Sequence, residues 1–85
     1  MRLAILFATM LSISACSNSV SDAVQKGKDL MAKGELAAAV IEFKNAVQSD
    51  SSSIDARVAL GEALERKGEL AGAEQSYRKA LELGG

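Results

Sequence analysis

Apolar residues near the end of the chain recur at spacings of three and four residues. This stripe consists of Leu70, Ala73, Tyr77, Ala80 and Leu81. Side chains with this spacing lie on one face of an α-helix, so the pattern predicts an amphipathic helix. A similar stripe earlier in the chain consists of Leu36, Val40, Phe43 and Val47. The chain therefore contains two predicted helices of the same kind.

Another helix and a glycine turn are predicted before each of these stripes. Ser53 is a favoured N-cap residue, and Asp55 lies in the first turn, where the helix dipole favours an acid. This helix is predicted to run to about Lys67, with Gly68 in a left-handed conformation after it. Ion pairs between residues four apart are expected to add support: Asp22–Lys26, Asp29–Lys33, Glu62–Arg66 and Glu74–Arg78.

The two helix pairs repeat at a constant offset without a gap. The shift that moves Gly27 onto Gly61 also moves Lys33-Gly34-Glu35-Leu36 onto Lys67-Gly68-Glu69-Leu70, and Phe43 onto Tyr77. Self-similarity at a fixed period marks a helical-repeat architecture. No convincing strand pattern interrupts it, so the predicted fold class is all-α.

The first residues have the pattern of an export signal rather than of a folded element. Arg2 supplies a positive charge, and an apolar run extends from Leu3 to Ile13. The run is too short for a permanent membrane-spanning helix, which needs about 20 apolar residues. A polar stretch begins at Ser17, so cleavage of a signal peptide is predicted.

Composition excludes several function classes. The 85-residue chain has no histidine, one cysteine and a formal charge of −1, so no cysteine–histidine metal site and no basic stripe for nucleic acid are expected. The serines have no histidine to activate them, and Glu62, Glu65 and Glu69 share a helix face with Arg66, which indicates a solvated surface rather than an acid–base pair. We expect no enzyme activity, no metal and no cofactor other than a covalent lipid.

The repeated units resemble the tetratricopeptide repeat (TPR). The residues that match its signature, and are expected to pack the repeats, are Gly27, Leu30, Gly34, Leu36, Ala39, Phe43 and Ala46 in residues 20–53, and Gly61, Leu64, Gly68, Leu70, Ala73, Tyr77 and Ala80 in residues 54–85. The resemblance implies two helical hairpins that bind other proteins. Departures occur at Ala23 and Arg57, where the family has a large aromatic residue, and at Ser51 and Gly85, where it has proline.

Ile13-Ser14-Ala15-Cys16 resembles the lipobox of bacterial lipoproteins. The resemblance implies a signal peptide at residues 1–15, a lipidated and acylated N-terminus carrying groups such as palmitate on Cys16, and a short linker to residue 19. Several acyl chains together would anchor the protein stably to a membrane. Ser17 resembles the outer-membrane sorting class, which implies a lipid anchor in the outer membrane facing the periplasm. The alternative is an ordinary secretory signal with an incidental cysteine.

The combination of lipobox, serine-rich spacer and these hairpins resembles the start of PEP-CTERM-system TPR-repeat lipoproteins. That resemblance implies a membrane-anchored interaction scaffold in polysaccharide export or a similar envelope assembly process. The alternative is a pilotin-like escort lipoprotein for pilus or outer-membrane assembly, in which the lipid carries the activity.

The first helix of each TPR hairpin lines the concave surface in this family. The candidate partner-binding residues there are Lys28, Met31, Asp55, Val58, Glu62 and Glu65. The alternative for each is a plain solvated position. Two hairpins leave one side of the helix from Leu70 to Leu81 uncovered, so we expect further repeats in a longer chain or self-association.

Overall fold

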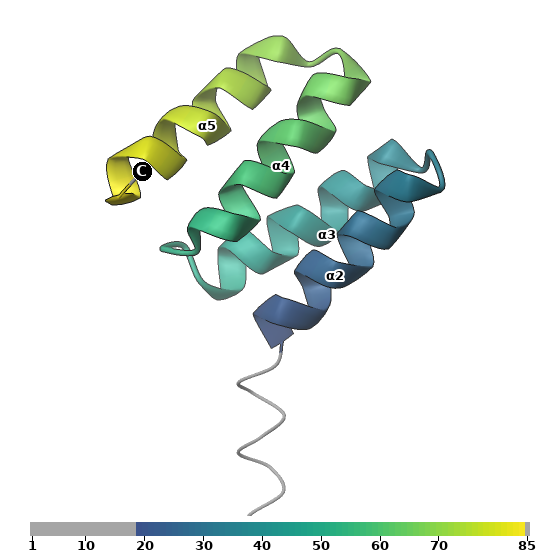
Figure 1. The fold of residues 1–85 in the computed structure, drawn as a ribbon, viewed down its shortest axis with the longest axis horizontal. Helices are drawn as coiled ribbons and strands as arrows, with labels where there is room; N and C mark the ends of the chain where they lie inside the picture. The colour runs from purple at the N-terminus through teal and green to yellow at the C-terminus, as the bar shows by residue number, and fades with distance from the viewer. Residues whose placement is uncertain (1–18, 85) are drawn as a thin grey trace, which may run out of the picture.

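A computed structural model describes residues 19–84, which form four α-helices: α2 (Ser19–Ala32), α3 (Leu36–Ser49), α4 (Ile54–Lys67) and α5 (Leu70–Gly84) (Figure 1). The described part of the chain contains no strand, which confirms the all-α class. The predicted signal peptide and Cys16 lie outside the described residues.

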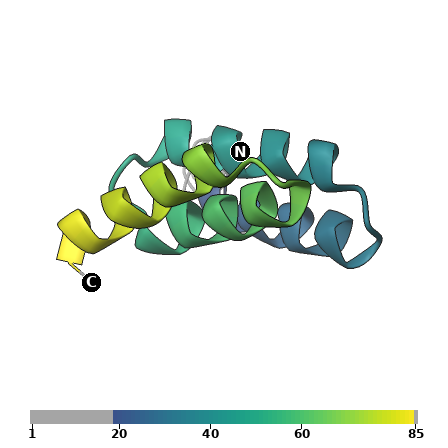
Figure 2. The ribbon, with the colours of Figure 1, turned by 90° about the horizontal axis from the view of Figure 1, so that it is seen from above.

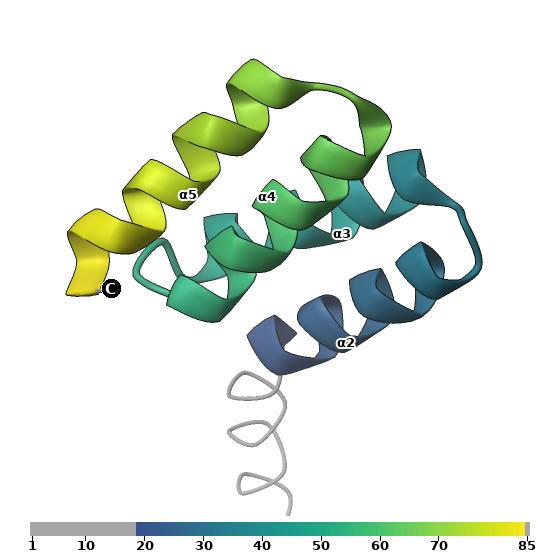
Figure 3. The same cartoon turned by 45° about the horizontal axis from the view of Figure 1, so that its top comes forward.

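The helices form two antiparallel hairpins that stack side by side. The pairs α2–α3 and α4–α5 are the hairpins, and α4 packs against α3 and more lightly against α2. Figure 3 shows α4 next to the first hairpin, with α5 on its far side. Figure 2, seen from above, shows α2 and α4 below α3. Among the described helices, α5 therefore packs against α4 alone, whereas α3 is covered by both α2 and α4.

The same turn closes both hairpins. Gly68 has a φ of 89°, and its N–H donates to the carbonyl oxygens of Leu64 and Glu65. Gly34 has a φ of 83°, and its N–H donates to the Met31 oxygen at 3.0 Å. A positive φ is easily adopted only by glycine, so these two residues fix where α2 and α4 end.

The linker between the hairpins is held by polar contacts at the start of α4. The Ser53 hydroxyl accepts a hydrogen bond from the Ala56 N–H at 3.2 Å, which confirms the predicted N-cap. Arg57, which replaces the aromatic residue of the TPR signature, donates from Nε to the Ser51 carbonyl oxygen at 3.0 Å. Arg57 therefore ties α4 to the loop that precedes it.

Removal of the cap should weaken α4 measurably. We expect Ser53→Ala to lower the free energy of unfolding by about 1 kcal/mol, because the Ala56 N–H loses its partner. Urea denaturation followed by circular dichroism measures the change. Ser49→Ala, at an exposed position at the end of α3, is the control and should change little; equal effects of the two substitutions would contradict the capping role.

The core lies where the helices meet and is built mainly from alanine. Its buried apolar members are Val24, Ala39, Val40, Phe43, Ala46, Ala56, Ala59, Leu60, Ala63, Leu64 and Ala73. Among the described residues, Phe43 is the one large side chain that is fully buried. Small residues bring the helix axes close together, and the Phe43 ring of α3 packs against Gly27 of α2 within the first hairpin.

Only one of the four expected ion pairs within helices forms, and one is replaced by a pair between helices. Glu74 and Arg78 do pair, at 3.1 Å. Lys26, expected to pair with Asp22, instead lies 3.8 Å from Glu42 of α3. The other two expected pairs, Asp29–Lys33 and Glu62–Arg66, do not occur among the ion pairs of the described residues. Exposed pairs of this kind gain little energy, so small differences in side-chain reach decide which of them form.

Candidate functional site

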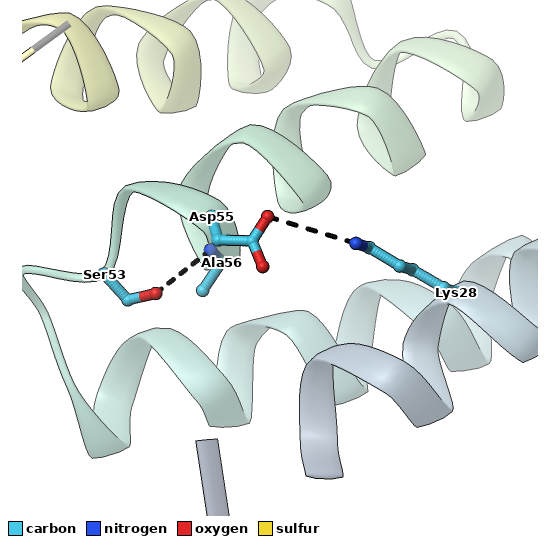
Figure 4. Close-up of polar contacts among 4 residues, drawn as sticks. All are labelled: Lys28, Ser53, Asp55 and Ala56. Atoms are coloured by element: carbon cyan, nitrogen blue, oxygen red, sulfur yellow. Dashed lines mark hydrogen bonds and ion pairs between the residues drawn. The ribbon is translucent and has the colours of Figure 1, made fainter. Parts of the chain in front are cut away.

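The candidate partner-binding residues all lie on α2 and α4, the first helices of the two hairpins. The closest link between them is an ion pair of 4.0 Å between Lys28 Nζ of α2 and Asp55 Oδ1 of α4 (Figure 4). The side chains are 47% and 73% exposed, so solvent screens their attraction. This pair joins the two hairpins on the candidate surface while leaving both groups accessible to a partner.

The apolar candidates differ in how accessible they are. Val58 is 38% exposed on α4. Met31 is only half-exposed because it packs against the core. A partner would therefore meet Val58 directly, whereas Met31 supports the surface from below.

The acidic candidates continue the surface along α4. Glu62 and Glu65 are both exposed. The Tyr77 hydroxyl of α5 donates a hydrogen bond of 2.9 Å to Glu65 Oε1. Burial, together with this hydrogen bond, raises the pKa of Tyr77 above its usual 10.0. The bond orients the Glu65 carboxylate and joins the two helices of the second hairpin.

The chemistry of the surface changes from one hairpin to the next. The shift that relates the repeats replaces Lys28 by Glu62 and Met31 by Glu65. The α2 end is thus basic and apolar, and the α4 end is acidic. This polarity would favour a partner segment whose own charge changes along its length.

The repeat-packing residues have three distinct environments. Gly27, Ala39, Phe43, Ala46, Gly61, Leu64, Ala73 and Ala80 are buried; Leu30, Leu36 and Tyr77 are half-buried; Gly34, Gly68 and Leu70 are exposed. Gly27 faces the Phe43 ring and Gly61 faces the Tyr77 ring, each so closely that a Cβ atom would collide with it. The two glycines therefore allow the helices of each hairpin to approach closely.

The described residues show no geometry suited to catalysis. They enclose no pocket and contain no cluster of three potential metal ligands. Glu69 pairs with Lys67 at 2.8 Å, and hydrogen bonding to that lysine lowers the pKa of the exposed Glu69 carboxyl. The glutamates of α4 and the following turn are thus exposed surface groups. None of the described helices has the length and hydrophobicity needed to cross a membrane.

Two features of the site were missed by sequence reasoning. Arg57 was noted only as a departure from the repeat signature, yet it holds the Ser51 loop. The Lys28–Asp55 pair was not anticipated either, because the two residues lie on different hairpins. The alignment of the repeats gives no signal for the second, because it matches Lys28 with Glu62 and Asp55 with Ser21.

Comparison with known proteins identifies a family for the chain. No curated protein matches the chain. The model of the tetratricopeptide repeat family matches residues 24–85, which spans most of α2 and all of the other three helices. Such repeats generally form non-catalytic scaffolds for protein–protein interaction. Since the match covers more than half of the chain and agrees with the two stacked hairpins, the chain belongs to the tetratricopeptide repeat family.

Proposed function

We propose that this protein is a membrane-tethered scaffold that holds a protein partner on the exposed surface of α2 and α4. The observation that carries the proposal is the match of residues 24–85 to a family of interaction repeats. The surface offers an exposed valine, Val58, on the acidic helix α4, and the basic Lys28 on the neighbouring α2. Interfaces of this kind combine apolar contact with charges that set the orientation of the partner.

The proposed tether is a lipid on Cys16. Its support is the sequence Ile13-Ser14-Ala15-Cys16 after an apolar run, and Ser17 favours the outer membrane, with the hairpins facing the periplasm. The proposed process is polysaccharide export with a PEP-CTERM system, or a similar envelope assembly. A pilotin-like escort is the second candidate, favoured by the short distance in sequence between Cys16 and the first hairpin.

Lipidation can be tested by metabolic labelling with palmitate in cells that make the full chain. We expect the wild-type protein to incorporate label and to sediment with outer membranes, because several acyl chains bind a bilayer stably. Cys16→Ser should abolish the label. Ser17→Asp is the matched control: it should keep the label and move the protein to the inner membrane. Label that persists in Cys16→Ser would exclude the proposed anchor.

The two candidate functions separate when export and lipidation are uncoupled. The Cys16→Ser protein, exported through a different signal, should still capture its partner if it is a scaffold and should deliver nothing to the membrane if it is an escort.

For the binding surface, Glu62→Lys reverses a charge on α4, whereas Gln48→Lys changes an exposed position of α3. Loss of partner capture with Gln48→Lys but not with Glu62→Lys would show that the partner binds outside the exposed surface of α2 and α4.

A further inference from the structure

One side of α5 is uncovered, and comparison with the equivalent helix of the first hairpin, α3, shows how much more exposed its residues are. Leu70 and Leu81 are 64% and 67% exposed. Their repeat equivalents on α3, Leu36 and Val47, are only half-exposed, and Phe43 is fully buried where Tyr77 of α5 is half-exposed. The difference arises because α4 packs against α3, whereas among the described helices nothing covers the same side of α5.

Head-to-tail stacking of two copies, with α2 of one copy against α5 of the other, does not cover this side of α5 favourably. The residues of α4 that are buried in the core include Ala56, Ala59, Leu60 and Ala63. The equivalent positions on α2 are occupied by Asp22, Gln25, Lys26 and Asp29, all of them exposed. Placing α2 of one copy on α5 of another would remove Asp22, Asp29 and the exposed ion pair of Lys26 with Glu42 from water, which is strongly unfavourable.

The uncovered side of α5 is, by contrast, complementary to itself. Its residues are Leu70, Glu74, Tyr77 and Leu81, separated by four, three and four residues. This spacing is the same when read in either direction. In an antiparallel pair of α5 helices, Leu70 of each copy therefore meets Leu81 of the other, and Glu74 meets Tyr77.

Charge follows the same symmetry. Glu74 and Arg78 pair within one helix at 3.1 Å, and both are largely exposed. In the antiparallel pair, Arg78 of each copy lies beside Glu74 of the other, so the two acids at the centre of the contact are balanced by two bases. A parallel pair would instead place Glu74 against Glu74, which is repulsive.

We propose that the Leu70–Glu74–Tyr77–Leu81 side of α5 is the interface of a homodimer, in which two α5 helices pack antiparallel about a two-fold axis between residues 75 and 76. The contact is a single helix pair, so it is small compared with stable dimer interfaces, and we expect micromolar affinity in solution. Tethering both copies to one membrane raises their effective concentration and favours the dimer. The inference is independent of the partner surface on α2 and α4.

Cysteine cross-linking of the full chain in native membranes tests this arrangement. Antiparallel packing brings the two Glu74 positions within about 10 Å, given a rise of about 1.5 Å per residue and typical helix separations. We expect Glu74→Cys to form dimers with a short bismaleimide. Gln75→Cys is the matched control, because the neighbouring residue is exposed but projects to a different side of the helix. Its dimer yield should be about tenfold lower, as expected from that geometry.

Three further outcomes decide between this dimer and other occupants. Leu70→Cys should give few dimers, because antiparallel packing separates the two Leu70 positions by about 17 Å along the axis; efficient cross-linking there would show a parallel pair. A monofunctional maleimide reports whether each thiol is accessible. A Glu74→Cys thiol that is labelled but forms no dimer would overturn the proposal, because the site would then be open. A thiol that is shielded from the label without forming a dimer would also overturn it, and would indicate that another protein or a further repeat covers α5.

Charge exchange provides an independent check on the register. Because Glu74→Cys itself removes the acid, this check uses Leu81→Cys, with a long cross-linker that joins residue 81 of one copy to residue 81 of the other. Arg78→Glu should lower its dimer yield several-fold, and adding Glu74→Arg to Arg78→Glu should restore it. Unchanged yields in all these variants would contradict the proposed register.

Discussion

Replacing Phe43 by alanine should unfold most of the protein at 25 °C. The Phe43 side chain is 0% exposed and is the largest fully buried one among the described residues. Truncating a buried phenylalanine leaves a cavity and costs about 3–5 kcal/mol. A single small core of this kind supplies only about 3–5 kcal/mol of net stability, so the substitution removes nearly all of it. Far-ultraviolet circular dichroism and urea denaturation measure the loss of helix.

The repeat provides a matched control for this substitution. Tyr77 occupies the position equivalent to Phe43 but is only half-buried, since α5 packs against α4 alone among the described helices. Tyr77→Ala should therefore cost roughly half as much, because a cavity open to solvent is partly filled by water. Equal losses at both positions would show that Tyr77 is as well covered as Phe43, and would support a neighbour on α5 in solution.

Local signals in the sequence were sufficient for the helices, for the glycine turns that follow α2 and α4, and for the start of α4. Gly68 requires no partner outside its own turn to adopt a positive φ, and the Ser53 hydroxyl bonds to a backbone N–H three residues away. Contacts of this range depend on residues that are neighbours in sequence. The constant repeat offset then relates the two hairpins, because the same residues recur in the same order.

Contacts between elements were harder to predict. Lys26 has Asp22 on its own helix, yet it pairs with Glu42, and Lys28 reaches Asp55 on the other hairpin. Which pair forms depends on how far the helices are separated and turned, and spacing along one helix contains no such information. For the same reason the sequence placed Met31 on the candidate surface without indicating that it also packs against the core.

The glycines at the helix crossings should respond to substitution according to how freely the opposite ring can move. In Gly27→Ala the new Cβ would collide most closely with Cε1 of Phe43 and lie 2.7 Å from Cδ1 and Cζ, and in Gly61→Ala it would lie 2.6 Å from Cε1 of Tyr77. Alanine gains about 1 kcal/mol of helix propensity over glycine, whereas overpacking of a sealed core costs about 1–3 kcal/mol or more. Phe43 is enclosed and cannot yield, so Gly27→Ala should be clearly destabilising, by about 2 kcal/mol. Tyr77 can swing toward its exposed side at the cost of disturbing its hydrogen bond to Glu65, so Gly61→Ala should be less destabilising than Gly27→Ala.

Gly72 completes the series as the control for helix propensity. A Cβ at this position would lie 3.3 Å from Cδ1 of Leu64, the end of a flexible side chain that can adjust. Gly72→Ala should therefore stabilise the protein, by up to about 1 kcal/mol. Urea denaturation of the three variants should give the order Gly72→Ala, Gly61→Ala, Gly27→Ala from most to least stable. If Gly61→Ala proves as destabilising as Gly27→Ala, the Tyr77 ring is held from outside, and the free side of α5 is covered in solution.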